Sequence, residues 1–117
     1  MSRTDEAYAE LIRRVKDYNL LASCGALLGW DERTYMPHEG SAHRAEQMAL
    51  VARLTHEMAT APRLGELLAE VEGGALGEDA AANVREIRRS YDRAVKLPPD
   101  LVETIVATEV VALHPNK

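Results

Sequence analysis

Apolar residues recur at the spacing of an α-helix through most of the chain, and proline or glycine interrupts this pattern at four places. The interruptions fall at Pro37, Pro62, the pair Gly73 and Gly74, and the pair Pro98 and Pro99. Proline lacks an amide hydrogen and disfavours helical geometry in the residue before it, so helices end ahead of Pro37 and Pro98, whereas Pro62 suits a first helical turn. These breaks predict an all-α chain of four to five helices.

The same pattern sets the expected boundaries of the helices. Thr4 is the expected N-cap of the first helix, which ends near residues 34–36. Ser41 is the expected cap of the second helix, which ends around Ala59, and Thr60 is that of the third, which stops at the glycine pair. A fourth helix begins at Glu78 or Asp79 and ends at residues 97–99, and a fifth begins near residues 99–100. Residues 105–111 are the best candidate for a strand, but their acidic neighbours favour helix. We therefore expect one helical bundle that forms a single domain over residues 1–117.

The polar face of the first helix disappears between Leu20 and Trp30. This change predicts that the second half of the helix is enclosed on most sides, with Cys24 as a buried and inert thiol. Gly25 and Gly29 lie on one stripe of small residues, which predicts that another helix approaches closely there.

Composition excludes several classes of protein. The chain has 14 basic and 19 acidic side chains, a net charge of -5, with the two signs interleaved, which argues against a nucleic-acid partner. The first ten residues are polar and acidic rather than a signal peptide, and the longest nearly continuous apolar run is about half of what a bilayer span needs. We expect a cytoplasmic protein that does not contact membranes.

Residues 29–37 carry a combination that helix formation alone does not require. The signature residues are Trp30, Asp31, Thr34, Met36 and Pro37. Two further blocks follow in order: residues 40–57, which contain Gly40, then Arg44-Ala45-Glu46-Gln47 and later His56-Glu57, and residues 83–103, which contain Asn83-Val84-Arg85-Glu86 and Leu97-Pro98. In these three blocks the chain resembles the N-terminal part of the thermostable, Taq-type zinc metallocarboxypeptidase family. The resemblance covers about residues 7–107 and leaves residues 108–117 as a divergent tail.

The resemblance implies a much larger, mainly helical, homodimeric zinc enzyme that removes C-terminal amino acids from peptides. In that family the zinc is held by two histidines of a His-Glu-x-x-His helix and a downstream glutamate, and the glutamate of the motif activates the bound water. The motif belongs to the second half of such enzymes. We therefore expect no catalytic residue and no metal ligand in residues 1–117, with zinc implied only for the full-length family.

One segment imitates the zinc motif, since His56-Glu57-Met58-Ala59-Thr60 begins as the motif does. Two imidazoles must converge on one ion from consecutive helical turns, and Thr60 stands where the second histidine is needed. We expect His56 to be a surface or helix-packing residue.

Two roles remain open for the signature and for Arg44. Trp30, Asp31 and Arg44 border a substrate groove in one reading, where the arginine would meet a peptide carboxylate. In the other reading, which we favour, Asp31 pairs with Arg44 or caps backbone amides, and Trp30 packs at the helix end.

Two hypotheses follow for the chain as a whole. In the first, the chain is a truncated, frameshifted or shortened product that is inactive alone and meets peptide substrate only in the full-length context. In the second, it is a stand-alone helical interaction or dimerisation module. The expected partner is accordingly a second copy in a homo-oligomer or the missing catalytic region.

Overall fold

The computed structural model describes residues 2–34 and 40–97, and these form four helices. They are α1 (Arg3–Thr34), α2 (Ser41–Ala59), α3 (Pro62–Glu72) and α4 (Glu78–Ala94). The all-α prediction is confirmed, and the expected breaks at residues 60–61 and 73–77 separate the last three helices. The predicted fifth helix falls outside the described residues.

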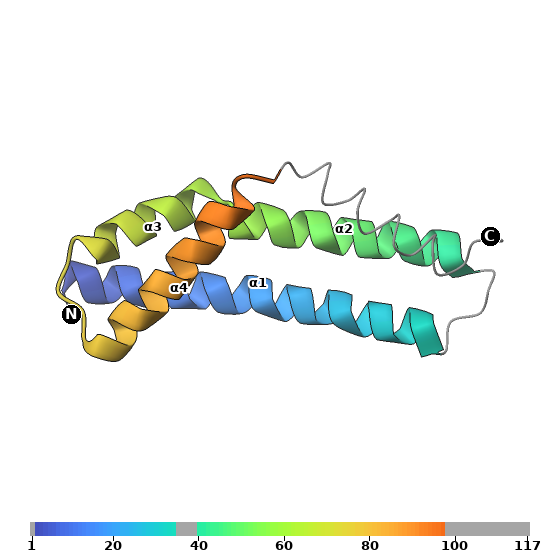
Figure 1. Cartoon of the computed structure of the whole chain (residues 1–117), viewed down its shortest axis with the longest axis horizontal. Coiled ribbons are helices and arrows are strands. Elements are labelled where there is room, and N and C mark those ends of the chain that lie inside the picture. The colour runs from blue at the N-terminus through green and yellow to red at the C-terminus, as the bar shows by residue number, and fades with distance from the viewer. Residues whose placement is uncertain (1, 35–39, 98–117) are drawn as a thin grey trace.

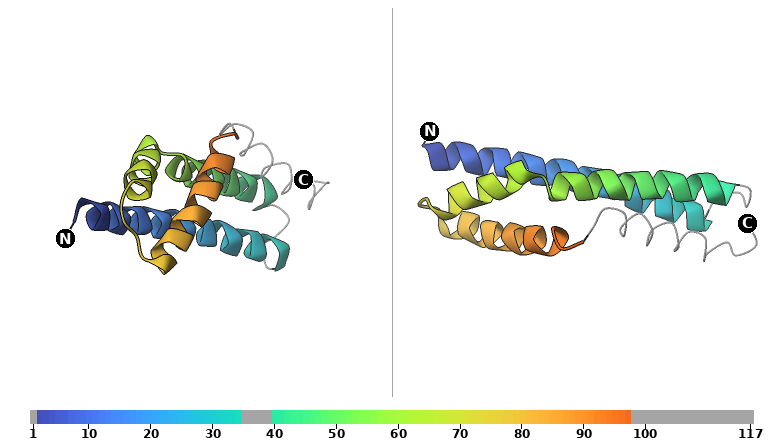
Figure 2. Two further views of the ribbon diagram at one scale, coloured as in Figure 1. Left: turned by 60° about the vertical axis from the view of Figure 1, so that its left-hand side comes forward. Right: turned by 90° about the horizontal axis from the view of Figure 1, so that it is seen from above.

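Helix α1 is the axis of the molecule, as Figure 1 shows. Helix α2 returns alongside its C-terminal half, and α3 continues the return path alongside its N-terminal half. Helix α4 crosses over α1 in a second layer and ends near the junction of α2 and α3, as Figures 1 and 2 show. The resulting shape is elongated, measuring 56 × 25 × 18 Å, and its radius of gyration of 17.3 Å exceeds the value of about 13 Å for a compact domain of this length.

The main hydrophobic cluster of the described residues lies at the end where α1, α3 and α4 meet. Its fully buried side chains are Leu11 of α1 and Leu64, Leu67, Leu68 and Val71 of α3, and Val84 and Ile87 of α4 close the cluster. Burying each of the large aliphatic side chains stabilises the fold by roughly 1.5–3 kcal/mol. This packed end holds α1 in place, and the hairpin of α1 and α2 extends away from it.

Two glycines bring α1 and α2 together in that hairpin. A Cβ atom at Gly25 would lie 3.2 Å from Val51 Cγ1, and one at Gly29 would lie 3.4 Å from Met48 Cε. The close approach predicted from the small-residue stripe is therefore confirmed.

Three expectations about α1 were wrong. The helix begins at Arg3, two residues before the start at Asp5 that a Thr4 N-cap implies, and the Ser2 hydroxyl accepts a hydrogen bond from the Asp5 amide at 3.1 Å. The second half is not enclosed: Leu20 is 65% exposed, and Cys24 is exposed instead of buried. The reason is that α2 covers one side of this half, whereas α3 lies against the other half of the helix.

Candidate functional site

The signature residues that the structure describes lie in the last turns of α1. The Thr34 hydroxyl donates a hydrogen bond to the Trp30 carbonyl at 2.8 Å, which satisfies a backbone acceptor near the end of the helix. Trp30 is 50% exposed. Met36 and Pro37, the other two members of the signature, lie outside the described residues. The observed contact in this turn is therefore one that shapes the end of a helix.

Arg44, in the first turns of α2, joins the two helices at the open end of the hairpin. Its Nη1 atom donates to the Leu28 carbonyl at 2.7 Å and lies 2.9 Å from Asp31 Oδ2, while its Nε donates to Gln47 Oε1 at 2.9 Å. The Arg44 side chain is 14% exposed and that of Asp31 is 41% exposed. The guanidinium is thus largely buried between the backbone of α1 and the Asp31 carboxylate.

These distances show that Asp31 and Arg44 form a pair, one of the contacts that the sequence left open. The choice between a structural role and a substrate-groove role for the signature residues stays a prediction, because the pair is compatible with either. The capacity of Arg44 for further hydrogen bonds is limited, because its Nη1 and Nε atoms already contact oxygen acceptors. A peptide carboxylate would have to use the remaining Nη2 edge or displace one of these partners.

The residues that imitate a zinc motif do not fit a metal. His56 is buried, with 9% of its surface exposed, and the Thr60 hydroxyl, in the place of a second ligand, donates to the His56 carbonyl at 2.8 Å. Glu57 is exposed and accepts a hydrogen bond from Arg53 at 3.4 Å. Across residues 2–34 and 40–97, no three histidine, cysteine, aspartate or glutamate side chains gather closely enough to hold an ion.

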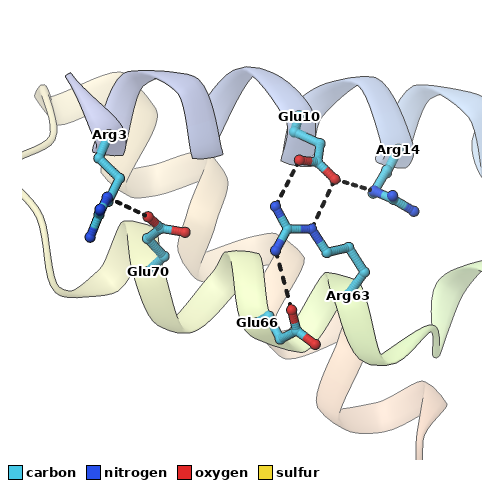
Figure 3. Close-up of polar contacts among 6 residues, drawn as sticks. All are labelled: Arg3, Glu10, Arg14, Arg63, Glu66 and Glu70. Carbon is cyan, nitrogen blue, oxygen red and sulfur yellow. Dashed lines mark hydrogen bonds and ion pairs between the residues drawn. The ribbon is translucent and has the colours of Figure 1, made fainter. Parts of the chain in front are cut away.

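A second polar cluster ties α1 to α3 at the packed end (Figure 3). Arg63 contacts both carboxylate oxygens of Glu10, at 3.0 Å from Nε and 2.9 Å from Nη2, and Arg14 Nε donates to the same carboxylate at 2.8 Å. Hydrogen bonds from Arg63 first, and from Arg14 second, lower the pKa of Glu10 to about 2. Arg63 also donates to Glu66 at 3.2 Å. All these charges are compensated, so the cluster is an inter-helix clamp.

No signal in the sequence could have found two of these contacts. Glu10 and Arg63 are separated by 53 positions, so no helical spacing relates them. Arg44 also bonds to the Leu28 carbonyl of α1, and a backbone acceptor cannot be recognised from the amino-acid sequence. The sequence alone shows only the pattern of residues 29–37 and 40–47.

The described helices and contacts define an all-α chain in which Trp30, Asp31 and Thr34 of the signature lie in the last turns of α1. The family model described as Carboxypeptidase Taq (M32) metallopeptidase matches residues 10–115. The chain belongs to this family, as the sequence resemblance predicted.

The chain is also similar to a protein called Thermostable carboxypeptidase 1, from Thermus thermophilus. The two are 45% identical over 109 residues, which make up 90% of this chain and 21% of that protein. The chain therefore spans about a fifth of the length of the relative it matches. Among the described helices, none has the length and apolarity that a membrane crossing needs.

Proposed function

We propose that this chain forms the N-terminal helical part of a zinc-dependent metallocarboxypeptidase, an enzyme that hydrolyses the last peptide bond of its substrate. The single observation that carries the proposal is the 45% identity over 90% of the chain to a thermostable carboxypeptidase. The described residues offer no metal cluster, so zinc would be held elsewhere in the polypeptide. The cytoplasmic location stays a prediction.

In this proposal residues 1–117 contribute scaffold and not chemistry. The packed end of α1, α3 and α4 fixes the axis, and Arg44 locks α2 against α1. Trp30, Asp31, Thr34, Met36 and Pro37 then serve to end α1 at a defined position. We propose the same structural role for Arg44, because its Nη1 and Nε are held by the backbone, Asp31 and Gln47.

The decisive experiment measures zinc content and peptidase activity of the purified 117-residue chain. A blocked dipeptide is incubated with the chain and added zinc, and the release of the C-terminal amino acid is followed, with the Thermus thermophilus relative as the positive control. We expect no release above background and less than one zinc per ten chains. Stoichiometric zinc that is lost in His56→Ala, or turnover by the chain alone, would contradict the scaffold role.

Exposed leucines favour a second candidate function, a helical dimerisation module. Leu20 and Leu27 of α1 are each 65% exposed, and Leu50 and Leu54 of α2 are 45% and 38% exposed. Exposed large apolar side chains are a feature of many protein interfaces. Light scattering after size-exclusion chromatography tests this candidate: a dimer that Leu27→Glu converts to a monomer supports it, and a native monomer at all accessible concentrations excludes it.

A further inference from the structure

An apolar groove runs between α1 and α2 and reaches the end of α4, with a cavity of about 470 Å³. Its floor is formed by the close approach of Gly25 to Val51. The lining comes mainly from small and aliphatic residues: Ala22, Met48, Ala52, Ala59, Ala94 and Leu97. Branched aliphatic side chains fill such a groove well, because they reach between helices whose facing residues include several alanines.

Few polar groups interrupt this surface. His56 lines the groove and is 9% exposed, and the Thr55 hydroxyl is already engaged with the Val51 carbonyl at 2.7 Å. Burial raises the pKa of the Tyr18 hydroxyl, which lies at the same groove. The groove therefore favours an apolar occupant with little charge. Without an occupant, its aliphatic side chains are in contact with water, which is unfavourable.

The course of the chain brings one candidate occupant to this place. Leu97, the last described residue, is itself part of the lining, so the chain leaves α4 at the edge of the groove. The sequence that follows has the aliphatic residues Leu101, Val102, Ile105 and Val106, at the spacing of one helical face. The family match extends to residue 115 and so includes this stretch.

We propose that the groove between α1 and α2 is the docking site for residues 99–113 of the same chain. Fifteen residues in helical form span roughly 22 Å, and the part of α2 that lines the groove, from Met48 to Ala59, spans roughly 17 Å, so the segment is long enough. Because the segment is tethered at Leu97, its effective concentration at the groove is in the millimolar range. A second copy of the chain competes poorly at ordinary protein concentrations.

Docking in this groove leaves the exposed leucines of α1 and α2 available. Leu20, Leu27 and Leu50 are absent from the lining of the groove, and Leu54 lines a separate hollow. An intramolecular segment in the groove and a partner at these leucines are therefore compatible. The proposal does not depend on the peptidase assignment.

Disulfide capture in the full chain tests the proposal. In a Cys24→Ser background, Ala52→Cys is combined with Ile105→Cys in one variant and with Val106→Cys in another, and each is mildly oxidised. We expect an intramolecular disulfide in at least one of the two, seen as a monomer with altered mobility on a non-reducing gel. Glu46→Cys with Val106→Cys is the matched control and stays reduced, because Glu46 is an exposed α2 residue outside the groove lining.

Hydrogen exchange of the amides of residues 48–59 provides a second readout that does not depend on the geometry of one cysteine pair. The double variant Ile105→Asp and Val106→Asp is expected to raise their exchange rates by about tenfold, whereas Glu103→Gln leaves them unchanged. A disulfide between two chains would show that a second copy fills the groove and would overturn the proposal. So would unchanged exchange together with the absence of any disulfide.

Discussion

Replacing Arg44 with methionine tests whether the signature region is structural. The substitution keeps most of the aliphatic stem and removes the guanidinium, and with it the 2.7 Å bond to the Leu28 carbonyl and the 2.9 Å contact with Asp31. A hydrogen bond from a charged donor contributes about 1.5–3 kcal/mol, and an ion pair with a carboxylate that is 41% exposed adds at most about 1 kcal/mol. Leu28 lies inside α1, so its carbonyl keeps a helical partner and is not orphaned.

The expected loss for Arg44→Met is about 2 kcal/mol of the free energy of unfolding, which corresponds to roughly 6–12 °C in Tm. Urea denaturation is followed by far-UV circular dichroism and by the fluorescence of Trp30, the single tryptophan of the chain, which lies beside the perturbed contacts. Arg13→Met is the matched control, because Arg13 is an exposed residue of the same helix, and it is expected to change stability by less than about 0.5 kcal/mol.

A double-mutant cycle with Asp31→Asn separates the two contacts of Arg44. Because Asp31 is partly exposed, the coupling free energy between Asp31 and Arg44 is expected to stay below about 1 kcal/mol, and most of the loss is assigned to the Leu28 carbonyl. An Arg44→Met variant that is no less stable than Arg13→Met would refute a structural role for the guanidinium. If Asp31→Asn alone costs as much as Arg44→Met, the ion pair and not the Leu28 carbonyl supplies most of the stability.

Three further substitutions probe the packed end. Glu10→Gln should remove an acid-sensitive clamp. The pKa of Glu10 is lowered from 4.5 to about 2, so the contribution of its carboxylate to folding stability is full above pH 4.5 and is lost as the pH falls toward 2. In acid titrations the variant should therefore lose less stability than the native chain across that interval. Equal acid sensitivity of variant and native chain would contradict this. Gly74→Ala should cost about 1–3 kcal/mol, because its new Cβ would lie 2.6 Å from Thr4 Cγ2 and 2.9 Å from Thr4 Cβ, whereas Gly73→Ala meets only ordinary contacts and should be nearly neutral in thermal unfolding. Leu67→Ala, at a side chain with no exposed surface, should cost about 2–5 kcal/mol by chemical denaturation, and a loss below about 1 kcal/mol would mean that this core repacks freely.

Local signals made the helix boundaries predictable from the sequence. The expected second and third helices match α2 and α3 closely, because a proline or a glycine pair acts on the backbone at its own position. The caps expected at Ser41 and Thr60 were wrong, since no side chain caps the start of α2 or α3 and the Thr60 hydroxyl bonds back to the His56 carbonyl. The close approach at Gly25 and Gly29 was predictable for the same reason: the absence of a Cβ is a property of the residue itself.

Burial along α1 was not predictable in this way. Periodicity shows that Leu20 and Leu27 are apolar, but it does not show whether another element covers them. The Glu10–Arg63 clamp was not predictable either, since it joins residues that lie 53 positions apart in the sequence. The Asp31–Arg44 pair was foreseen only as one of two readings, and the bond from Arg44 to the Leu28 carbonyl was not foreseen at all, because a backbone acceptor exists at every position.

The separation between a packed end and an open hairpin bears on every stability measurement above. Leu67 and Glu10 report on the end where α1, α3 and α4 meet, whereas Arg44 reports on a hairpin held by two helices. A two-helix unit buries less apolar surface than the three-helix core, so its amides should open at lower free energy than global unfolding requires. Exchange of α2 amides faster than those of α3 in the native chain, with a further increase only in α2 for Arg44→Met, would show that the signature region stabilises a local unit. Uniform exchange through both helices would instead mean that the hairpin and the core unfold together, and the signature would then share in the stability of the whole domain.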